Sequence, residues 1–172
     1  SADDIGLELF GVKGGTGYNL IENNSIVGSF NDAMYFRNNM DGRRIKINNN
    51  VAQRVLSFTR TFIQADTFGT AQVEINYNLT SNLALGTISC QNCVSLGNVS
   101  SNPSINSTTG QSFSSFAINN GHPGKLYTDT DLTRNDRGVA GGSFNYENFW
   151  PIQTGGSRVF LVKAPRVAIQ TT

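Results

Sequence analysis

The sequence predicts an all-β fold, an antiparallel β-sandwich or jelly roll of about nine or ten short strands with little or no helix. Apolar and polar residues alternate with period two in many segments, whereas helical spacing is almost absent. Gly and Asn, which favour turns, recur between these segments. The chain also contains 11 Phe, 5 Tyr and 1 Trp, more aromatic residues than disordered chains have, so a packed core is expected.

The clearest strand pattern covers residues 71–77, where apolar side chains occupy the odd positions and polar ones lie between them. The same alternation indicates strands at 5–12 and 44–47. Residues 51–64 are rich in β-branched residues and Thr and are predicted to form one long strand. Further strands are expected at 25–30, 33–37, 82–90, 112–118, 143–149, 157–163 and 166–170.

The whole chain, residues 1–172, is predicted to form one sandwich domain. Turn-forming pairs such as Gly14-Gly15 and Asp41-Gly42 separate the strands. The Ser- and Asn-rich stretch 92–111 is long enough to be a mobile loop. No internal repeat is visible, and no linker divides the chain.

Charge is sparse: charged residues make up 15% of the chain and the net charge is +1. This balance does not indicate direct binding of nucleic acid, and none is expected. A small basic cluster is expected to lie on an ordinary solvated face; it comprises Arg43, Arg44, Lys46 and Arg54. No apolar run approaches the length of a membrane helix, so no membrane span is expected.

Cys90 and Cys93 are the only cysteines, and they are a candidate disulfide. Two reduced thiols are the alternative. A redox site would need a thioredoxin-like pattern, and a zinc site would need two more soft ligands, so neither is expected. The sequence indicates no cofactor, and the cysteines indicate no metal centre.

His122 is the only histidine, and it stands between Gly and Pro in an expected surface turn. Because the common nucleophilic triads need a histidine base, the sequence gives no support for a catalytic site, and an enzyme is not expected. A run of oxygen ligands that leaves calcium binding open comprises Asp129, Asp131, Asn135 and Asp136.

Four sequons mark possible glycosylation sites at Asn23, Asn78, Asn98 and Asn106. A chain this rich in Asn, Ser and Thr contains about this many by chance, so the motif does not by itself indicate a secreted glycoprotein.

The leading functional expectation is a non-enzymatic structural subunit outside the cell that assembles with copies of itself into a pilus or surface filament. The N-terminal strand could be donated to a neighbouring subunit's sheet, with Gly14-Gly15 as the hinge. The apolar residues of this candidate donor strand are Ile5, Leu7, Leu9 and Val12.

Two alternatives remain open. One is a viral or phage coat or spike protein with a jelly-roll fold, which would place the protein in a virion instead of on a cell surface. The other is a carbohydrate-binding or adhesion module, in which Tyr146, Phe149 and Trp150 could form an aromatic platform for sugars.

Overall fold

The computed structural model describes residues 5–10, 14–55, 60–81, 83–84, 92–124, 127–129 and 133–142. These residues form strands and irregular segments and contain no α-helix. The strands are β1 (Ile5–Leu9), β2 (Asn19–Glu22), β3 (Ser25–Gly28), β4 (Asp32–Asn39), β5 (Arg44–Asn48), β6 (Val51–Arg54), β7 (Arg60–Thr67), β8 (Gln72–Asn76), β9 (Leu79–Ser81), β10 (Leu83–Ala84), β11 (Asn92–Leu96) and β12 (Val99–Ser100).

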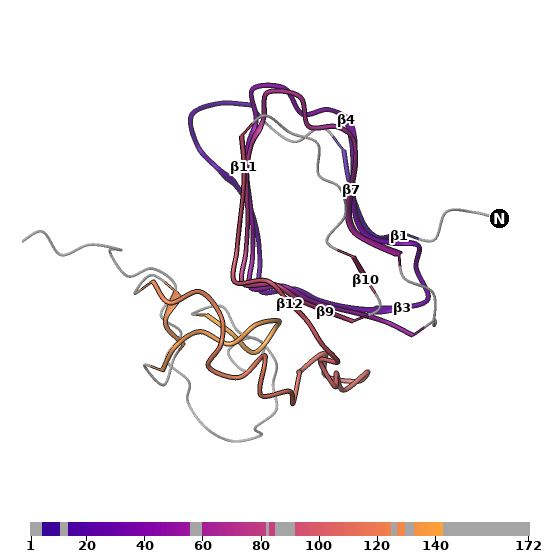
Figure 1. The fold of residues 1–172 in the computed structure, drawn as a ribbon, viewed down its shortest axis with the longest axis vertical. Coiled ribbons are helices and arrows are strands. Elements are labelled where there is room, and N and C mark those ends of the chain that lie inside the picture. Colours follow the sequence, from indigo (N-terminus) through magenta and orange to yellow (C-terminus); the bar gives the residue numbers. More distant parts are fainter. Residues whose placement is uncertain are drawn as a thin grey trace, which may run out of the picture.

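The strands form three four-stranded sheets: sheet A in the order β1-β4-β7-β10, sheet B in the order β11-β8-β5-β2, and sheet C in the order β12-β9-β6-β3. Every pairing between these strands is parallel. The chain therefore visits the sheets in turn, and β1–β3, β4–β6, β7–β9 and β10–β12 make coils 1 to 4 of a parallel β-helix. Seen along the coil axis, the strands superpose as walls around a shared interior (Figure 1).

The prediction of an antiparallel β-sandwich or jelly roll is therefore wrong, although the prediction of a strand-rich chain is confirmed. Alternation reports only that one face of a strand is buried and the other faces outward. A coil of parallel strands gives the same pattern as a sandwich, because its strands also have an inner and an outer face. The alternation could not distinguish the two.

The expectation that the chain has no internal repeat is also wrong. Equivalent asparagines of successive coils, Asn24, Asn50, Asn78 and Asn98, are separated by 26, 28 and 20 residues. Because the connections between strands vary in length, the repeat has no constant period, which hides it in the sequence.

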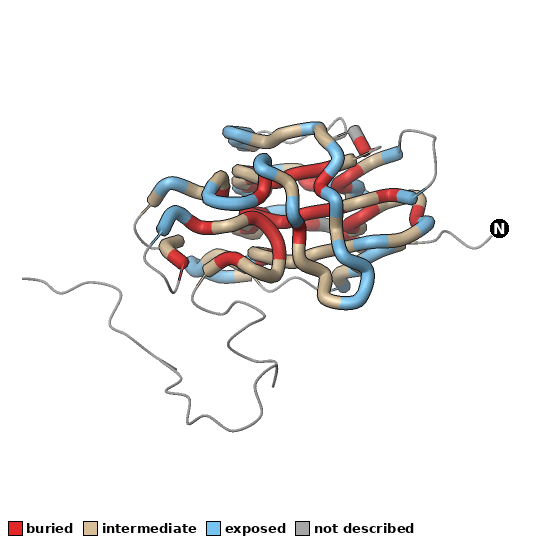
Figure 2. Tube along the Cα trace, turned by 90° about the horizontal axis from the view of Figure 1, so that it is seen from below, coloured by how far each residue is buried: buried red, intermediate tan, exposed pale blue. Residues whose placement is uncertain are grey.

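Apolar side chains fill the interior of the coil and are aligned in columns across neighbouring strands. Ile21, Ile47 and Ile75 are in register on neighbouring strands of sheet B, and all of them are buried. Met34 of sheet A is likewise in register with Ile63, and Phe36 packs against Phe68 with ring centroids 5.5 Å apart. Figure 2 shows buried residues concentrated in the middle of the molecule.

A ladder of asparagine side chains joins the coils at the turn between sheets B and C. Asn24, Asn50, Asn78 and Asn98 follow one another up this turn, each Nδ2 donating to the next Oδ1 at 2.9 to 3.0 Å. The residue before each ladder position has positive φ: 56° at Asn23, 57° at Asn49, 57° at Tyr77 and 66° at Gly97. Asn and Gly are the residues that adopt this conformation most readily, which explains the Asn pairs in the sequence.

Several predicted strands differ from the observed ones. Residues 51–64 do not form one strand, since β6 ends at Arg54 and β7 begins at Arg60, in a different sheet. Residues 112–118 contain no strand and instead form turns, with a single bridge from Ile105 to Ser112. The expected loop at 92–111 contains β11 and β12, and β2 was not predicted. The predicted strands at 143–149, 157–163 and 166–170 lie outside the described residues.

The predicted donor strand is β1, which pairs with β4 in its own sheet. Leu7 and Leu9 are half-buried and pack against the core, and Val12 lies outside the described residues. Strand donation to a neighbour stays a prediction.

After coil 4, the described residues between 101 and 142 form an irregular outer segment. This outer segment lies outside the coil, near the corner where sheets B and C meet (Figure 1). Its Ala117 is buried in a small cluster with Val51 and Leu79 of sheet C. Among the described residues, no helix is long and apolar enough to cross a membrane.

Candidate binding site on the outer face of sheet B

The outer face of sheet B presents polar side chains in register on neighbouring coils. Arg44 is aligned with Gln72, and Lys46 is aligned with Glu74. Inward-pointing Ile45 and Ile47 alternate with Arg44 and Lys46, so burial of the isoleucines forces the charged side chains outward.

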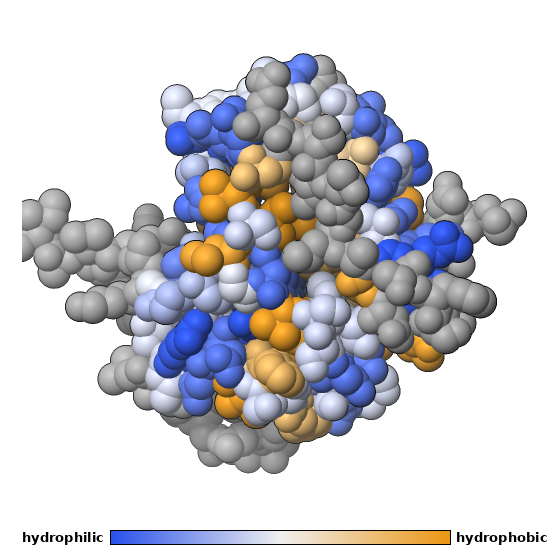
Figure 3. Space-filling model, in the orientation of Figure 1, coloured by the Kyte–Doolittle hydropathy of each residue, from blue (hydrophilic) through white to orange (hydrophobic). Residues whose placement is uncertain are grey.

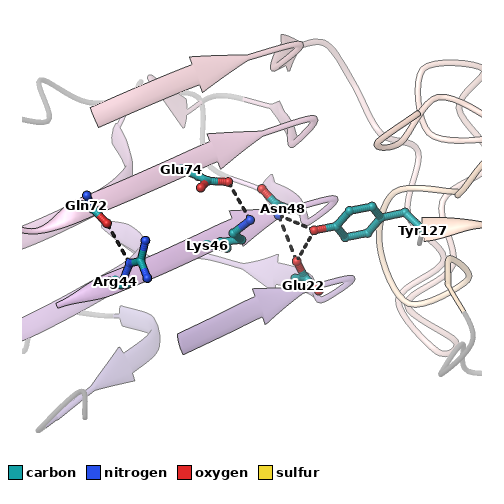
Figure 4. A network of polar contacts seen from close by, with 7 residues as sticks. All are labelled: Glu22, Arg44, Lys46, Asn48, Gln72, Glu74 and Tyr127. Atoms are coloured by element: carbon teal, nitrogen blue, oxygen red, sulfur yellow. Dashed lines mark hydrogen bonds and ion pairs between the residues drawn. The ribbon is translucent and has the colours of Figure 1, made fainter. Parts of the chain in front are cut away.

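Two direct contacts cross this face between coils 2 and 3 (Figure 4). Lys46 Nζ lies 3.0 Å from Glu74 Oε2, and Arg44 Nε donates to Gln72 Oε1 at 2.7 Å. Burial alone would lower the pKa of Lys46, but the hydrogen bond and negative charge of Glu74 outweigh it and raise that pKa. The lysine is therefore firmly cationic.

Tyr18 lies on the same face, just before β2. The Arg44 guanidinium carbon lies 4.6 Å and Lys46 Nζ 4.3 Å from the centroid of its ring. Both distances fall in the cation–π range, so the two cations hold this ring on the outer face.

At the other end of the face, Tyr127 of the outer segment reaches onto sheet B. Its hydroxyl donates to Glu22 Oε1 at 3.2 Å, and Asn48 Nδ2 donates to the same oxygen at 2.9 Å (Figure 4). Asn48 Nδ2 also lies 3.3 Å from the Tyr127 hydroxyl. Burial, reinforced by Glu22, raises the pKa of Tyr127, so the phenol stays protonated. This contact fixes the outer segment against coils 1 and 2.

His122 packs between two tyrosines, edge-to-face on Tyr77 and tilted on Tyr127, instead of extending into solvent. Its ring centroid lies 5.0 Å from that of Tyr77 and 4.2 Å from that of Tyr127. Its Nδ1 accepts a hydrogen bond from the Gly124 backbone N–H at 3.0 Å. Burial is the main cause that lowers the pKa of His122, so the neutral ring predominates at pH 7.

Backbone contacts bring His122 to this position. The His122 N–H donates to Asn49 Oδ1 at 2.7 Å, and the Gly121 N–H donates to the Asn135 carbonyl at 2.7 Å. A Cβ on Gly121 would lie 2.6 Å from the Asn135 carbonyl oxygen, so only glycine allows this approach. The close approach explains the glycine before His122.

Among the described residues, two buried amide oxygens next to these groups have no hydrogen-bond partner: Asn48 Oδ1 and Asn76 Oδ1. Asn48 and Asn76 are in register on sheet B, 1% and 7% exposed respectively. A buried acceptor without a partner is destabilising, and because these oxygens are inaccessible from the surface, they are not part of the candidate binding surface.

The charges of this face compensate one another. Arg44 and Lys46 supply two positive charges, and Glu22 and Glu74 supply two negative ones. Around them stand amides and the rings of Tyr18 and Tyr127. Such a surface suits a neutral ligand rich in hydroxyl groups better than a polyanion.

The cysteines and the acidic run do not contribute to this face. Cys93, on β11, is disulfide-bonded and packs partly against the core, and Cys90 lies outside the described residues, so their pairing stays a prediction. The two oxygens of Asp129 accept hydrogen bonds from the backbone N–H groups of Asp136 and Gly142. Asp136 Oδ1 accepts from the Asn119 N–H, and Asp131 lies outside the described residues. In the described part of the chain, no group of three metal-ligating side chains occurs.

The four sequons occupy different environments. Asn78 is fully buried in the ladder, Asn98 is bonded within it, and the Nδ2 of Asn23 contacts oxygens of the outer segment. Asn106 is exposed, and its Oδ1 accepts from the backbone of Thr108. A glycan on Nδ2 is compatible with this fold most readily at Asn106.

Sequence reasoning identified Arg44 and Lys46 only as part of a basic cluster, and it missed Glu22, Tyr18 and Tyr127. The structure separates that cluster, because Arg54 is buried and donates to the Phe30 carbonyl. The coil repeat, which aligns positions 46 and 74, was the signal that could have paired these charges. The predicted platform of Tyr146, Phe149 and Trp150 lies outside the described residues.

The chain was also compared with known proteins: no protein family, no curated protein and no solved structure matches it.

Proposed function

We propose that this protein is a non-enzymatic extracellular adhesion module that binds a neutral carbohydrate on the outer face of sheet B. The observation that carries the proposal is a group of charged side chains on this face whose charges cancel: Arg44 and Lys46 against Glu22 and Glu74. The rings of Tyr18 and Tyr127 lie beside them. The disulfide-bonded state of Cys93 supports an oxidising, extracellular setting.

The regular spacing of the polar side chains on sheet B favours an extended ligand over a compact one. Adjacent coils repeat about every 4.8 Å, and alternate side chains along a strand lie about 6.8 Å apart. Lys46 and Glu74 therefore present a donor and an acceptor one coil apart, with Arg44 and Gln72 at the next position along the strands. An oligosaccharide lying across the coils could hydrogen-bond to each pair while one sugar face stacks on Tyr18.

The test is a glycan array followed by calorimetric titration of the best neutral oligosaccharide. Tyr18→Ala and Lys46→Met should each weaken binding by roughly tenfold, because each removes a central contact of about 1.4 kcal/mol. Because the face has no net charge, raising the salt concentration should change the affinity little.

Sheet A offers a matched control. Arg37 lies 4.2 Å from the ring centroid of Tyr35 and pairs with Glu8, which reproduces on another face the cation–π and ion-pair contacts of the proposed site. Arg37→Met should leave glycan affinity unchanged. The proposal is wrong if no glycan binds, or if Arg37→Met weakens binding as much as Lys46→Met does.

A carbohydrate-active enzyme with the same surface would give a different result. In that case Glu22→Gln or Glu74→Gln would abolish release of sugar products while binding persisted. We expect no product release by the unaltered protein, measured as new reducing ends during prolonged incubation with the bound glycan.

A further inference from the structure

We propose that copies of this chain stack head to tail, so that coil 4 of one molecule is followed by coil 1 of the next. Within the described residues, each strand of coil 1 has one neighbouring strand, and the same is true of each strand of coil 4. Within the described part of the chain, both ends of the coil therefore present edge strands, which readily pair with another chain.

The asparagine ladder gives these ends opposite hydrogen-bonding character. The backbone N–H and Nδ2 of Asn24 both donate to Asn50 Oδ1, at 3.0 and 2.9 Å. Asn50 donates in the same way to Asn78 Oδ1 at 2.9 and 3.0 Å, and Asn78 to Asn98 Oδ1 at 2.9 Å in both bonds. The same junction thus occurs at each of the internal coil boundaries.

At the two ends of the coil, the described residues provide only one side of this ladder junction. Asn24 Oδ1 accepts no hydrogen bond from the described part of the chain, whereas each later ladder oxygen accepts two. The Asn98 backbone N–H has no acceptor among the same residues. The acceptor missing at Asn98 is the one that Asn24 of a second copy would supply.

The backbone N–H groups of the residues just before the first three ladder asparagines also donate toward the following coil. The Asn23, Asn49 and Tyr77 N–H groups donate to carbonyls of the following coil, at Asn48, Asn76 and Leu96. Gly97 holds the same place in coil 4, with a φ of 66°, and its N–H has no such carbonyl among the described residues. A following coil 1 would provide it.

Exposed apolar side chains point to the same contact. Among the described strands, large exposed hydrophobic residues occur only in the end coils: Leu20 and Val27 in coil 1, and Val94 and Leu96 in coil 4. Leu20, Lys46, Glu74 and Val94 form one aligned column on the outer face of sheet B. The column is an ion pair in the middle and apolar at both ends, so stacking would place Val94 beside Leu20 of the next copy.

The described part of the outer segment does not cover the interior of the coil at either end (Figure 1). Viewed along the coil axis, it lies beside the coil and not across its interior (Figure 1). Apolar atoms are visible near the middle of the end seen in this direction (Figure 3). At coil 1, a hollow of about 630 Å³ is lined by Ile5, Gly6, Ser25, Ile26, Val27, Ser29 and Phe30, all from that coil or the residues just after it.

A second copy is the occupant that these ends specify, because the donors left at coil 4 match the acceptor left at coil 1 in the register that the chain itself uses between coils. Two different surfaces meet in such a contact, so it is heterologous and, without ring closure, generates an open filament.

The experiment is sedimentation velocity over a wide concentration range on the full 172-residue chain, with electron microscopy of the assembled fraction. Filaments lengthening with concentration are expected. Val94→Lys should raise the concentration of half-assembly by roughly tenfold or more, because it places an ammonium in the apolar contact. Val55→Lys is the matched control, since Val55 is 65% exposed and lies outside the strands.

A charge-pair rescue separates a junction effect from a folding effect. Val94→Lys alone should impair assembly, whereas Val94→Lys combined with Leu20→Glu should restore it, because each new charge then lies beside an opposite charge in its own copy, Glu74 or Lys46, and across the junction. These positions lie in coils 1 and 4 of one chain, so the two introduced charges meet only between copies. The proposal is overturned by a monomer at all concentrations, by a dimer that grows no further, or by equal effects of Val94→Lys and Val55→Lys.

Discussion

At the scale of single residues, the protonation state of His122 is coupled to the folding of the outer segment, because one of its ring nitrogens accepts a hydrogen bond there. Its Nδ1 accepts the Gly124 N–H at 3.0 Å, and an acceptor nitrogen cannot carry a proton. Burial also disfavours the charged ring, so the pKa of His122 is lower in the folded than in the unfolded chain. Protonation therefore favours unfolding.

The sign of this linkage gives a pH prediction. Because the unfolded chain binds the proton more tightly, the free energy of unfolding should fall as the pH drops from about 8 through the unfolded histidine value of about 6.5. His122→Gln should flatten this part of the curve, measured by urea denaturation at each pH. A wild-type stability that is constant between about pH 8 and 5.5, or an unchanged slope in His122→Gln, would contradict the assignment.

At the scale of the element, the asparagine ladder stabilises the coil because a ladder amide inside the coil accepts hydrogen bonds through Oδ1 and donates them through Nδ2. Asn50 Oδ1 accepts from Asn24, while its Nδ2 donates to the Ile21 carbonyl at 2.8 Å and to Asn78 Oδ1 at 3.0 Å. Its side chain is fully buried, so none of these bonds can be replaced by bulk water. Ladder residues inside the coil should therefore matter more than the one at its end.

Asn50→Ala should lower the free energy of unfolding by about 3 kcal/mol, because it leaves several buried groups without partners. Asn24→Ala should cost about 1 kcal/mol, because Asn24 is half-buried and its Oδ1 has no partner in the described part of the chain. Chemical denaturation of both variants, with native circular dichroism as the folding check, tests this order. Equal losses would show that the ladder is not the stabilising unit.

At the scale of the whole molecule, Arg137 ties the outer segment to two different coils. Its guanidinium donates to the carbonyls of Asn78 at 3.2 Å and Gly97 at 3.1 Å, and its Nε donates to Asn120 at 2.8 Å. Burial lowers the pKa of Arg137 to about 10, which leaves it charged at neutral pH. The charge is thus solvated by backbone carbonyls in place of water.

Arg137→Met should detach the outer segment before the coil unfolds, since it removes these three bonds while keeping much of the side-chain volume. We expect a loss of about 3 kcal/mol in the segment's local stability and faster amide exchange at residues 117–121 than in β5 and β8. Hydrogen exchange with mass spectrometry measures both regions. Equal acceleration in segment and coil would mean that they unfold as one unit.

Stacking and binding would reinforce one another at this scale. A head-to-tail stack would extend sheet B across copies and repeat the proposed glycan face along the filament. Many weak sites on one filament bind a polymer more tightly than a single site does.

The sequence by itself determined that the chain is rich in strands and which residues face inward. Alternation at 44–47 and 71–77 was decisive, because burial of one face is a local property that period two records. The general preference of Asn for turns is likewise consistent with the positive φ observed at Asn23 and Asn49.

Only the tertiary structure decided which strands become neighbours. Lys46 is aligned with Glu74 by strand pairing. Glu22 accepts a hydrogen bond from Tyr127, which lies 105 residues later in the chain. No local sequence pattern encodes either contact. The parallel coil and the candidate site both depend on those long-range contacts. Because the connections differ in length from coil to coil, the repeat that creates them is regular in space but irregular along the chain.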